Sequence, residues 1–327
     1  MIEKTLKEEK ELEQTDIPMK SILELCKWAK NKDNFVSLND YMSFGHSFVD
    51  FISVPNNITA RIVSKNENNY RFLQYKKDAT FNITRPINSN LYLDEEEIDS
   101  SFQFFASVIK DSAKIKDLSA KERELLNKCI YTIQQSIGCA LDALPASENN
   151  TAKKINGDLF EKFMLLIFKA LQFNVESIFE DVSLEDVPDF KVKYQHDLAF
   201  KIEGDLRLIG SVKTSSKDRI DKVFIDKFLY NQIKKTDVPH FAIFLNDVQR
   251  KNTRNEADFA ISQTFLRGHF KGYSIALSPL DGVYYSDLRP VMKDDIFLKK
   301  EIKRLDELIC KDIWKLIHQK SRKKVVL

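Results

Sequence analysis

A carboxylate and a lysine are expected to meet at the open end of one β-hairpin. Residues 197–202 and 206–212 alternate apolar and polar side chains with period two, which predicts two strands joined by a tight turn. In that hairpin Asp197 lies opposite Val212, beside Lys213. Such a pair suits metal-assisted attack of water on a phosphodiester. Carboxylates hold Mg²⁺, and the lysine steadies the nucleophile or a phosphate oxygen.

The register of this hairpin depends on its turn. We expect Glu203 to pair with Leu206, which leaves Gly204 and Asp205 as the two turn residues. The alternative interpretation is an ordinary hairpin whose ends are solvated.

The segment after Lys213 is suited to contact DNA. Residues 213–219 read Lys-Thr-Ser-Ser-Lys-Asp-Arg at a strand-to-helix junction, where the hydroxyls and amides of Ser215 and Ser216 can grip phosphates. Lys217 and Arg219 can donate to a guanine edge, and Asp218 can accept from the exocyclic amine of cytosine. Residues 213–235 hold seven Lys or Arg against three Asp, a local charge of +4.

Ser-Val-Lys-Thr-Ser-Ser-Lys-Asp-Arg at 211–219, with Asp226 thirteen positions after Lys213, resembles a known signature. It is similar to that of PD-(D/E)XK type II restriction endonucleases of the CCGG/CCNGG group, the relatives of EcoRII, SsoII and NgoMIV. The resemblance covers roughly residues 155–290. It implies that Lys213 is catalytic and that Asp226, where the family commonly has Glu, replaces the acid missing at Ser211. Residues 217–219 then read the CC and GG steps.

The upstream acid of this signature has two candidates. Pro188-Asp189 matches the motif's name, whereas His196-Asp197 matches the hairpin geometry, which favours Asp197. Asp197 and Asp226 are the expected Mg²⁺ ligands. Glu161, placed early on the preceding helix, is either a further acid of the site or part of a solvated helix face.

Other residues carry weaker expectations. His196 is expected to be structural. Residues 249–251 with Arg254 contact the outer bases or phosphates, or are solvated loop charges. Tyr41, Phe44, Phe48 and Phe51 include a residue that stacks on a base, or they pack in the core. Residues 320–324 are a phosphate-contacting arm or a solvated tail.

The pattern of elements predicts a mixed α/β fold. Helices are expected at 158–173, 218–233 and 259–270, and strands at 189–194, 197–202, 206–212, 240–245 and 273–277. The resemblance implies a restriction-endonuclease-like αβββαβ core, a mixed sheet flanked by helices. We therefore expect a mainly helical region at 1–150, for DNA contacts and/or dimerisation, and a nuclease catalytic domain at 151–327.

Composition restricts the class of protein. The chain has 327 residues, 51 Lys and Arg against 49 Asp and Glu, and a net charge of +2. The longest apolar run, 163–168, is far below the ~18 residues of a membrane span, and no signal peptide is visible, so we expect a soluble cytoplasmic protein. Four scattered cysteines without a C-x-x-C pair argue against a zinc ribbon or a disulfide framework.

The resemblance implies a Mg²⁺-dependent type II restriction endonuclease acting as a homodimer on double-stranded DNA. It further implies a short palindromic CCNGG-like site, cut before the first C to leave five-nucleotide 5′ overhangs. A cognate DNA methyltransferase would be its functional partner, and no membrane is expected. The alternatives are a non-specific or repair-type nuclease of the same fold, or a catalytically inert DNA-binding protein.

Overall fold

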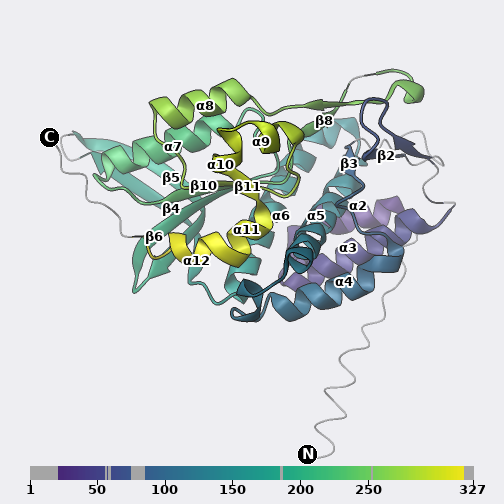
Figure 1. The fold of residues 1–327 in the computed structure, drawn as a ribbon, viewed down its shortest axis with the longest axis horizontal. Coiled ribbons are helices and arrows are strands. Elements are labelled where there is room, and N and C mark those ends of the chain that lie inside the picture. Colours follow the sequence, from purple (N-terminus) through teal and green to yellow (C-terminus); the bar gives the residue numbers. More distant parts are fainter. Residues whose placement is uncertain are drawn as a thin grey trace, which may run out of the picture.

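The computed structural model describes residues 21–55, 57, 60–74, 85–184, 187–251 and 253–319. The basic run at 320–324 therefore lies outside the described residues. The chain forms a mixed α/β structure in which helices flank a central sheet (Figure 1). Among the described residues, no helix is both long enough and apolar enough to span a membrane.

The described part of the first 150 residues is mainly helical. Its elements are α2 (Ile22–Lys30), α3 (Leu38–Ser53), β1 (Ala60–Val63), β2 (Tyr70–Gln74), β3 (Ile87–Asn88), α4 (Glu95–Val108) and α5 (Ala120–Asp142), and α6 (Asn149–Ala170) begins at its end. Capping boxes fix two of the helix starts: Ser37 with Asp40 before α3, and Ser119 with Glu122 before α5.

The second half alternates strands and helices. Its elements are β4 (Val175–Leu184), β5 (Val187–Ile202), β6 (Asp205–Lys213), α7 (Ile220–Ile233), β7 (His240–Phe244), β8 (Val248–Arg250), β9 (Ile261–Gln263), α8 (Arg267–Ala276), β10 (Gly282–Tyr285), α9 (Pro290–Asp294), α10 (Leu298–Glu301), β11 (Ile302–Arg304), α11 (Leu305–Glu307) and α12 (Ile313–Leu316).

The central sheet is mixed. Its six strands lie in the order β11-β10-β7-β6-β5-β4; β4, β5 and β6 are antiparallel neighbours, and β6, β7, β10 and β11 run parallel. From α6 to β7 the chain runs helix, three strands, helix, strand. The predicted mixed α/β class is confirmed.

Both faces of the sheet are covered, as β7 shows. Phe241 and Ile243 pack into the cluster that includes α6 and the C-terminal helices, whereas Ala242 and Phe244 pack against α7 and α8. Successive side chains of a strand point to opposite faces, so an entirely apolar strand requires two cover layers. Figure 1 shows α7 and α8 on one side of the sheet and α11 and α12 on the other.

The predicted strands at 189–194 and 197–202 are one strand, β5, and the first strand of the sheet is the unpredicted β4. β4 lies at the edge of the sheet, where its charged residues Glu176 and Asp181 stay exposed. Because these polar residues interrupt its apolar pattern, β4 lacks a clear strand signal in the sequence.

The predicted helix 259–270 and strand 273–277 are also wrong. The chain forms the short strand β9, then α8, and returns to the sheet only at β10. Residues 273–277 look like a strand because they are largely apolar. They are helical because Phe270 and Ser274, four residues apart, form the buried side of α8 while Ile275 is exposed.

The turn of the β5–β6 hairpin lies one residue earlier than expected, which changes the pairing register next to it by two residues. Ile202 pairs with Asp205, so the turn residues are Glu203 and Gly204, with φ of 53° and 89°. Two central residues with positive φ match the twist of a two-residue hairpin, and glycine adopts this conformation without strain. An irregularity between Phe200 and Lys201 then shifts the pairing, so that Leu198 lies opposite Gly210.

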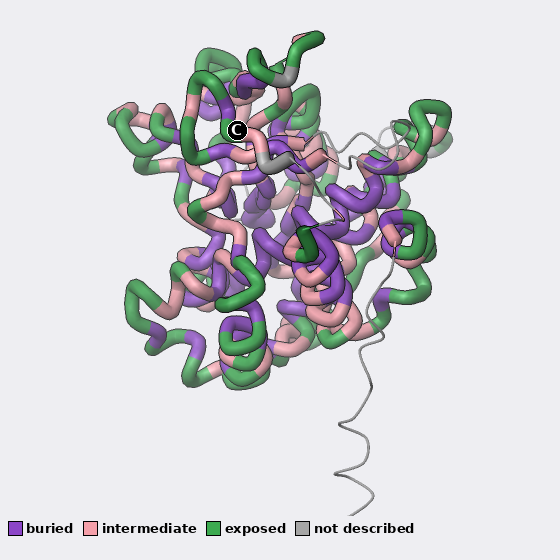
Figure 2. Tube along the Cα trace, turned by 90° about the vertical axis from the view of Figure 1, so that its right-hand side faces the viewer, coloured by how far each residue is buried: buried purple, intermediate pink, exposed green. Residues whose placement is uncertain are grey.

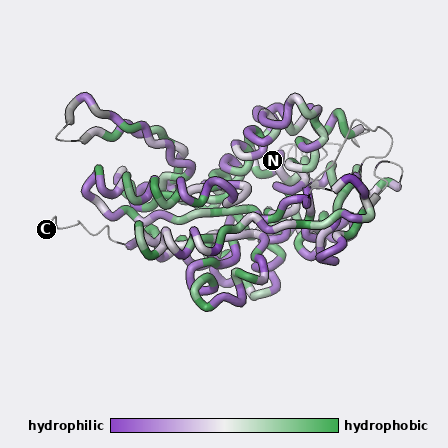
Figure 3. Tube along the Cα trace, turned by 90° about the horizontal axis from the view of Figure 1, so that it is seen from above, coloured by the Kyte–Doolittle hydropathy of each residue, from purple (hydrophilic) through white to green (hydrophobic). Residues whose placement is uncertain are grey.

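The N-terminal part of β5 extends beyond its pairing with β6. Only residues from Leu198 onward pair with β6, whereas residues from 187 to 196 pair with β4 alone. Residues 178–184 and 187–196 therefore form a two-stranded extension, which we call the β4–β5 arm; it projects from the body of the molecule in Figure 3. Tyr230 of α7 and Lys234, the residue that follows this helix, fix the base of the arm through Glu180, with Tyr230 Oη donating at 3.0 Å.

One hydrophobic core connects the two halves of the chain. A single cluster of buried residues includes Leu25 of α2, Phe163 of α6, Phe241 of β7 and Leu316 of α12. Figure 2 shows this continuous buried interior. The predicted boundary at residue 150 coincides with the start of α6 at Asn149, and the core is continuous across it.

Candidate active site

Lys213 lies between two carboxylates at the end of β6. Its Nζ donates to Asp197 Oδ2 at 2.6 Å and to Glu161 Oε1 at 2.8 Å. The structure thus brings together three of the residues that the sequence singled out, from α6, β5 and β6. Since α6 begins at Asn149, Glu161 lies beyond the middle of its helix and not early on it, as had been expected.

Asp197 is held in place by the backbone as well as by Lys213. Its Oδ2 accepts a hydrogen bond from Val212 N at 2.8 Å, and the residue is only 7% exposed. Asp197 stands where β5 leaves the arm and enters the sheet, between His196, which pairs with β4, and Leu198, which pairs with β6. The carboxylate is therefore preorganised beside the lysine.

Asp189, the alternative upstream acid, is not near this group. It lies in the β4–β5 arm, eight residues from Asp197 along one continuous strand, a separation of about 26 Å at about 3.3 Å per residue. Asp189 is exposed and does not line the cleft around Lys213. The structure therefore places Asp197, and not Asp189, beside the lysine.

Asp226 faces the same cleft from α7 without a hydrogen bond to Lys213 among the described residues. Burial raises the pKa of Asp226, and the nearby charges of Lys222 and Lys213 oppose that shift. The carboxylate of Asp197 raises it further. Asp226 and Asp197 are thus close enough to interact electrostatically, as an acid carried by this helix requires.

Negative charge exceeds positive charge at the centre of the site. Burial raises the pKa of Glu161, and the neighbouring Asp197 raises it further, while Lys213 opposes the shift. Burial lowers the pKa of Lys213, but Asp197 and Glu161 more than compensate, so its net shift is upward. Asp197 and Glu161 therefore share one half-buried ammonium group, and Asp226 adds a third carboxylate to the same cleft.

These oxygens are suited to a hard divalent cation. No three His, Cys, Asp or Glu side chains in the described part of the chain are grouped closely enough to hold an ion by themselves. Mg²⁺, however, keeps several waters and is usually bound through one or two protein carboxylates together with substrate phosphates. Asp197 with Glu161 or Asp226 fits that requirement, and the excess negative charge favours a cation there.

The cleft around Lys213 has a volume of ≈ 820 Å³. Its walls come from α6, the β4–β5 arm, the end of β6 and α7. Basic side chains line it around the central acids: Lys153, Lys154, Lys193, Arg219 and Lys222. An acidic centre with a basic rim can bind a cation and a polyanion at the same time.

The β4–β5 arm contributes an unusual pair of side chains to this cleft. Phe179 is 64% exposed, and Lys193 Nζ lies 5.3 Å from the centre of its ring. Both residues line the cleft. The arm thus offers an apolar ring and a positive charge on the wall opposite α6.

The β6–α7 loop, residues 214–219, presents the predicted reading residues. Lys217, Asp218 and Arg219 are all exposed, and Arg219 lines the cleft. Asp218 has a φ of 54°, in the left-handed region. Lys217 Nζ donates to Gln249 Oε1 at 3.0 Å, which brings the predicted 249–251 segment beside the loop.

The two serines of this loop both bind Asp247, but only Ser216 is buried, whereas Ser215 also lines the cleft. Ser216 is 1% exposed, and both its backbone N and its Oγ donate to Asp247, at 2.8 and 2.5 Å. Ser215 Oγ also donates to Asp247, at 2.9 Å. Their hydroxyls therefore hold the loop to the protein, and the hydroxyl of Ser216 is too buried in this structure for the expected phosphate contact.

Several other candidates are structural. Burial lowers the pKa of His196, which is stacked on Tyr194 and meets Tyr230 edge on. The aromatic residues Tyr41, Phe44, Phe48 and Phe51 are buried in the core, so in this structure they do not face the cleft. Arg254 is exposed in the loop after β8.

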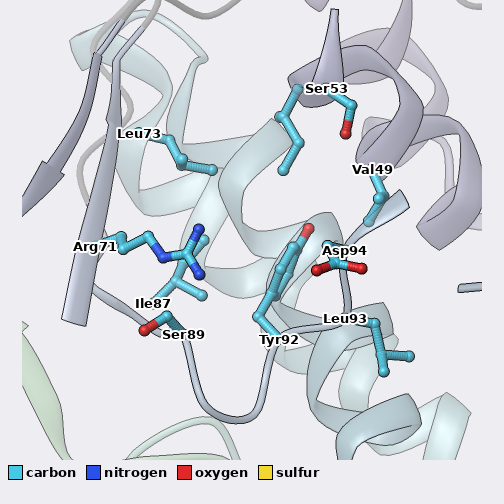
Figure 4. Close-up of a pocket in the computed structure, with 10 residues that line it drawn as sticks. Val49, Ser53, Arg71, Leu73, Ile87, Ser89, Tyr92, Leu93 and Asp94 are labelled. Atoms are coloured by element: carbon cyan, nitrogen blue, oxygen red, sulfur yellow. The ribbon is translucent and has the colours of Figure 1, made fainter. Parts of the chain in front are cut away.

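A second cavity lies in the N-terminal region. Apolar side chains form most of its wall, and Arg71, Tyr92 and Asp94 surround it in Figure 4. Its volume of ≈ 30 Å³ is enough for about two water molecules and too small for a nucleotide base. The cleft around Lys213 is therefore the better candidate site.

Sequence reasoning missed Asp247 and His240. Asp247 follows the predicted strand 240–245 in an Asn-Asp pair that looked like an ordinary turn. It is fully buried and binds the β6–α7 loop. His240, the first residue of β7, has its Nε2 2.9 Å from Ser211 Oγ of β6. The parallel pairing of β6 with β7 brings His240 next to Ser211. The sequence alone showed only that Asp247 follows the end of a strand.

No protein-family model matches the chain, and no curated protein is significantly similar to it in sequence. A solved structure, the crystal structure of the type IIP restriction endonuclease Kpn2I, is similar with a TM-score of 0.67 and 17% sequence identity. The similarity covers 93% of this chain and 98% of that one, so it includes the N-terminal helices as well as residues 155–290. At this identity the comparison shows the fold: the chain has a restriction-endonuclease-like fold over nearly its whole length.

Proposed function

We propose that this protein is a Mg²⁺-dependent, sequence-specific endodeoxyribonuclease that cuts both strands of DNA. The observation that carries the proposal is Lys213 held between Asp197 and Glu161 in a cleft with a basic rim. The fold shared with a type IIP restriction endonuclease supports the same reaction class.

The chain's own residues divide the work in this proposal. Asp197, fixed by Val212 N, provides oxygen ligands, and Asp226 supplies a second carboxylate from across the cleft. Lys213 places its charge next to the attacking water or the phosphate oxygen. A bound Mg²⁺ supplies charge stabilisation of the transition state and lowers the pKa of a coordinated water.

Sequence choice is assigned to the exposed tip of the β6–α7 loop. Lys217 and Arg219 donate to guanine edges and Asp218 accepts from cytosine, so the site contains CC and GG steps. Their exposure, and the position of Arg219 on the cleft wall, support this role. We propose a short palindromic CCNGG-like site cut before the first C.

A palindrome cut in both strands requires two active sites related by the dyad of the DNA. We therefore propose that the protein acts as a homodimer, because a symmetric pair places one cleft on each strand. In a cell such an enzyme requires protection of host DNA, which a cognate methyltransferase acting on the same site provides.

The test is cleavage of mixed-sequence plasmid DNA by the purified protein with Mg²⁺, followed by sequencing of the ends. Discrete fragments with one common end sequence are expected. A smear would indicate a non-specific nuclease, and no product would indicate an inert DNA-binding protein; either result contradicts the proposal. Protein carrying Lys213→Met, purified in parallel, controls for contaminating nucleases.

A further inference from the structure

A buried carboxylate lies at the end of β7, behind the β6–α7 loop. Asp247 is 0% exposed and accepts hydrogen bonds from Ser215 Oγ at 2.9 Å, Ser216 N at 2.8 Å, Ser216 Oγ at 2.5 Å, Thr264 Oγ1 at 3.3 Å and Tyr285 Oη at 2.7 Å. All these donors are neutral. Asp247 does not line the cleft around Lys213.

A carboxylate that is buried among neutral donors requires a physical explanation. Burial of a carboxylate without a cation is unfavourable unless hydrogen bonds compensate. Burial raises the pKa of Asp247, and its hydrogen bonds from Ser216, Tyr285 and Ser215 oppose that shift. An apolar side chain would fill the space at lower cost, but it could not fix the direction of several donors at once.

The donors to Asp247 belong to the loop that presents the reading residues. Ser216 is held at both ends: its side chain and N bind Asp247, while its carbonyl O accepts from Arg219 N and Ile220 N at 3.0 Å each. Lys217, Asp218 and Arg219 thus lie between an anchored residue and the first turn of α7. The left-handed φ of Asp218 indicates a conformation that requires such support.

Asp247 also fixes the second segment near the loop. Its backbone O accepts from Thr264 N at 2.9 Å, and Gln249, two residues later, accepts from Lys217 Nζ. The segment after β7 and the β6–α7 loop are therefore tied to the same residue. A displacement of Asp247 would move both of the segments that are candidates to contact bases.

We propose that Asp247 is a positioning residue for sequence discrimination. It holds the β6–α7 loop in the one arrangement in which Lys217, Asp218 and Arg219 meet base edges. Its loss therefore relaxes the choice of site more than it slows cleavage, because Asp197, Glu161 and Lys213 are held by separate contacts. This inference rests on the proposed function.

The experiment compares Asp247→Asn with Asp287→Asn. Asp287 is a matched control: it lies two residues after the neighbouring strand β10, is 1% exposed and accepts from Tyr70 Oη and Asn88 Nδ2, with no contact to the loop. Once cleavage mapping has given the site, kcat/KM is measured on that duplex and on duplexes with one base pair changed. Thermal unfolding is recorded for every variant.

We expect Asp247→Asn to lower the ratio of the two kcat/KM values by about tenfold or more, the loss of one base contact. Asp287→Asn should leave the ratio unchanged even where it lowers the melting temperature. If Asp247→Asn does not fold, Ser216→Ala removes one donor and should lower the ratio by a smaller factor.

An unchanged ratio in Asp247→Asn, or in Ser216→Ala where the first variant fails to fold, would overturn the inference and leave the proposed function intact. Equal effects of Asp247→Asn and Asp287→Asn would also overturn it, since they would show general destabilisation. A wild-type protein that cuts at no defined site would instead remove the proposed function, and this inference with it.

Discussion

The ammonium group of Lys213 has a fixed direction. Two short hydrogen bonds to acids from different elements hold it, so in the proposed reaction its charge would meet a phosphate without rearrangement. Lys227 is a useful contrast. Its Nζ is also buried and donates to Asp281 Oδ2 and Pro279 O at 2.6 Å each, but it lies away from the cleft.

These two lysines give the first prediction. Lys213→Met should lower the rate of cleavage about 10²-fold or more, the usual effect of removing one transition-state donor, while binding of DNA in Ca²⁺ is retained. Lys227→Met should lower stability and leave kcat near the wild-type value. Gel-based cleavage and binding assays check both. Wild-type rates in Lys213→Met would contradict the site.

The second prediction concerns Asp226. If it replaces the acid missing at Ser211, Asp226→Asn should lose most cleavage, and Asp226→Glu should retain measurable activity because its longer side chain still offers a carboxylate. Asp221→Asn, one turn earlier on α7 and outside the cleft, is the control. Activity is measured across a Mg²⁺ titration. If Asp226→Asn cuts normally, Glu161 is the second carboxylate.

At the scale of elements, base recognition by the β6–α7 loop is proposed to be distinct from phosphate binding elsewhere on the cleft. Arg219 at its tip is proposed to meet a guanine edge, whereas Lys153 on α6 lines the rim of the cleft, where a backbone phosphate would pass. The two side chains carry the same charge. They should nevertheless respond differently to the sequence of the bound DNA.

Arg219→Ala should reduce binding to the cognate site far more than binding to random duplex. One bidentate contact is worth about 1–3 kcal/mol, and the two copies in a homodimer about 2–6 kcal/mol if they add. Lys153→Ala should weaken both kinds of binding alike and lower the salt slope by about one. Competition titrations at several salt concentrations measure this. Equal losses in Arg219→Ala would make the loop a phosphate clamp.

The sequence predicted features that depend on neighbouring residues, and it did not predict those that depend on contacts between segments far apart in the chain. Asp197 and Lys213 could be placed together because one hairpin joins them, and the irregularity at Phe200 reduced the two-residue register error at the turn to one residue. β4 was missed because an edge strand tolerates charges on its open face. Asp247 was missed because its partners come from three separate segments.

At the scale of the whole molecule, buried histidines link stability to pH. His240 is completely buried, and burial, with the charges of Lys227, His196 and Lys213, holds its pKa well below the usual range. Burial also lowers the pKa of His196. His240 therefore stays neutral in the folded state where it would be protonated in the unfolded chain, below about pH 6.5.

At His240 the unfolded state therefore binds more protons, so this group makes stability fall as the pH decreases below about 6.5. Each fully neutral histidine contributes up to about 1.4 kcal/mol per pH unit. Denaturant unfolding at pH 7.5 and 5.5 measures the difference. His240→Gln, which can keep the contact to Ser211 Oγ, should reduce that difference; an equal loss in this variant would show that other groups cause it.

Under the proposed function, the shared hydrophobic core determines when each new molecule can become active. Residues 161 to 226 hold all the acids and the lysine of the site, but the core beneath them also needs Ile309, Ile313 and Leu316. During synthesis the ribosome releases the candidate site well before it releases these side chains. A nascent chain therefore carries every reacting group without a rigid cleft to align them. The proposed cleavage activity should therefore appear in one late step, after residues 309–317 have been synthesised and have packed into the core.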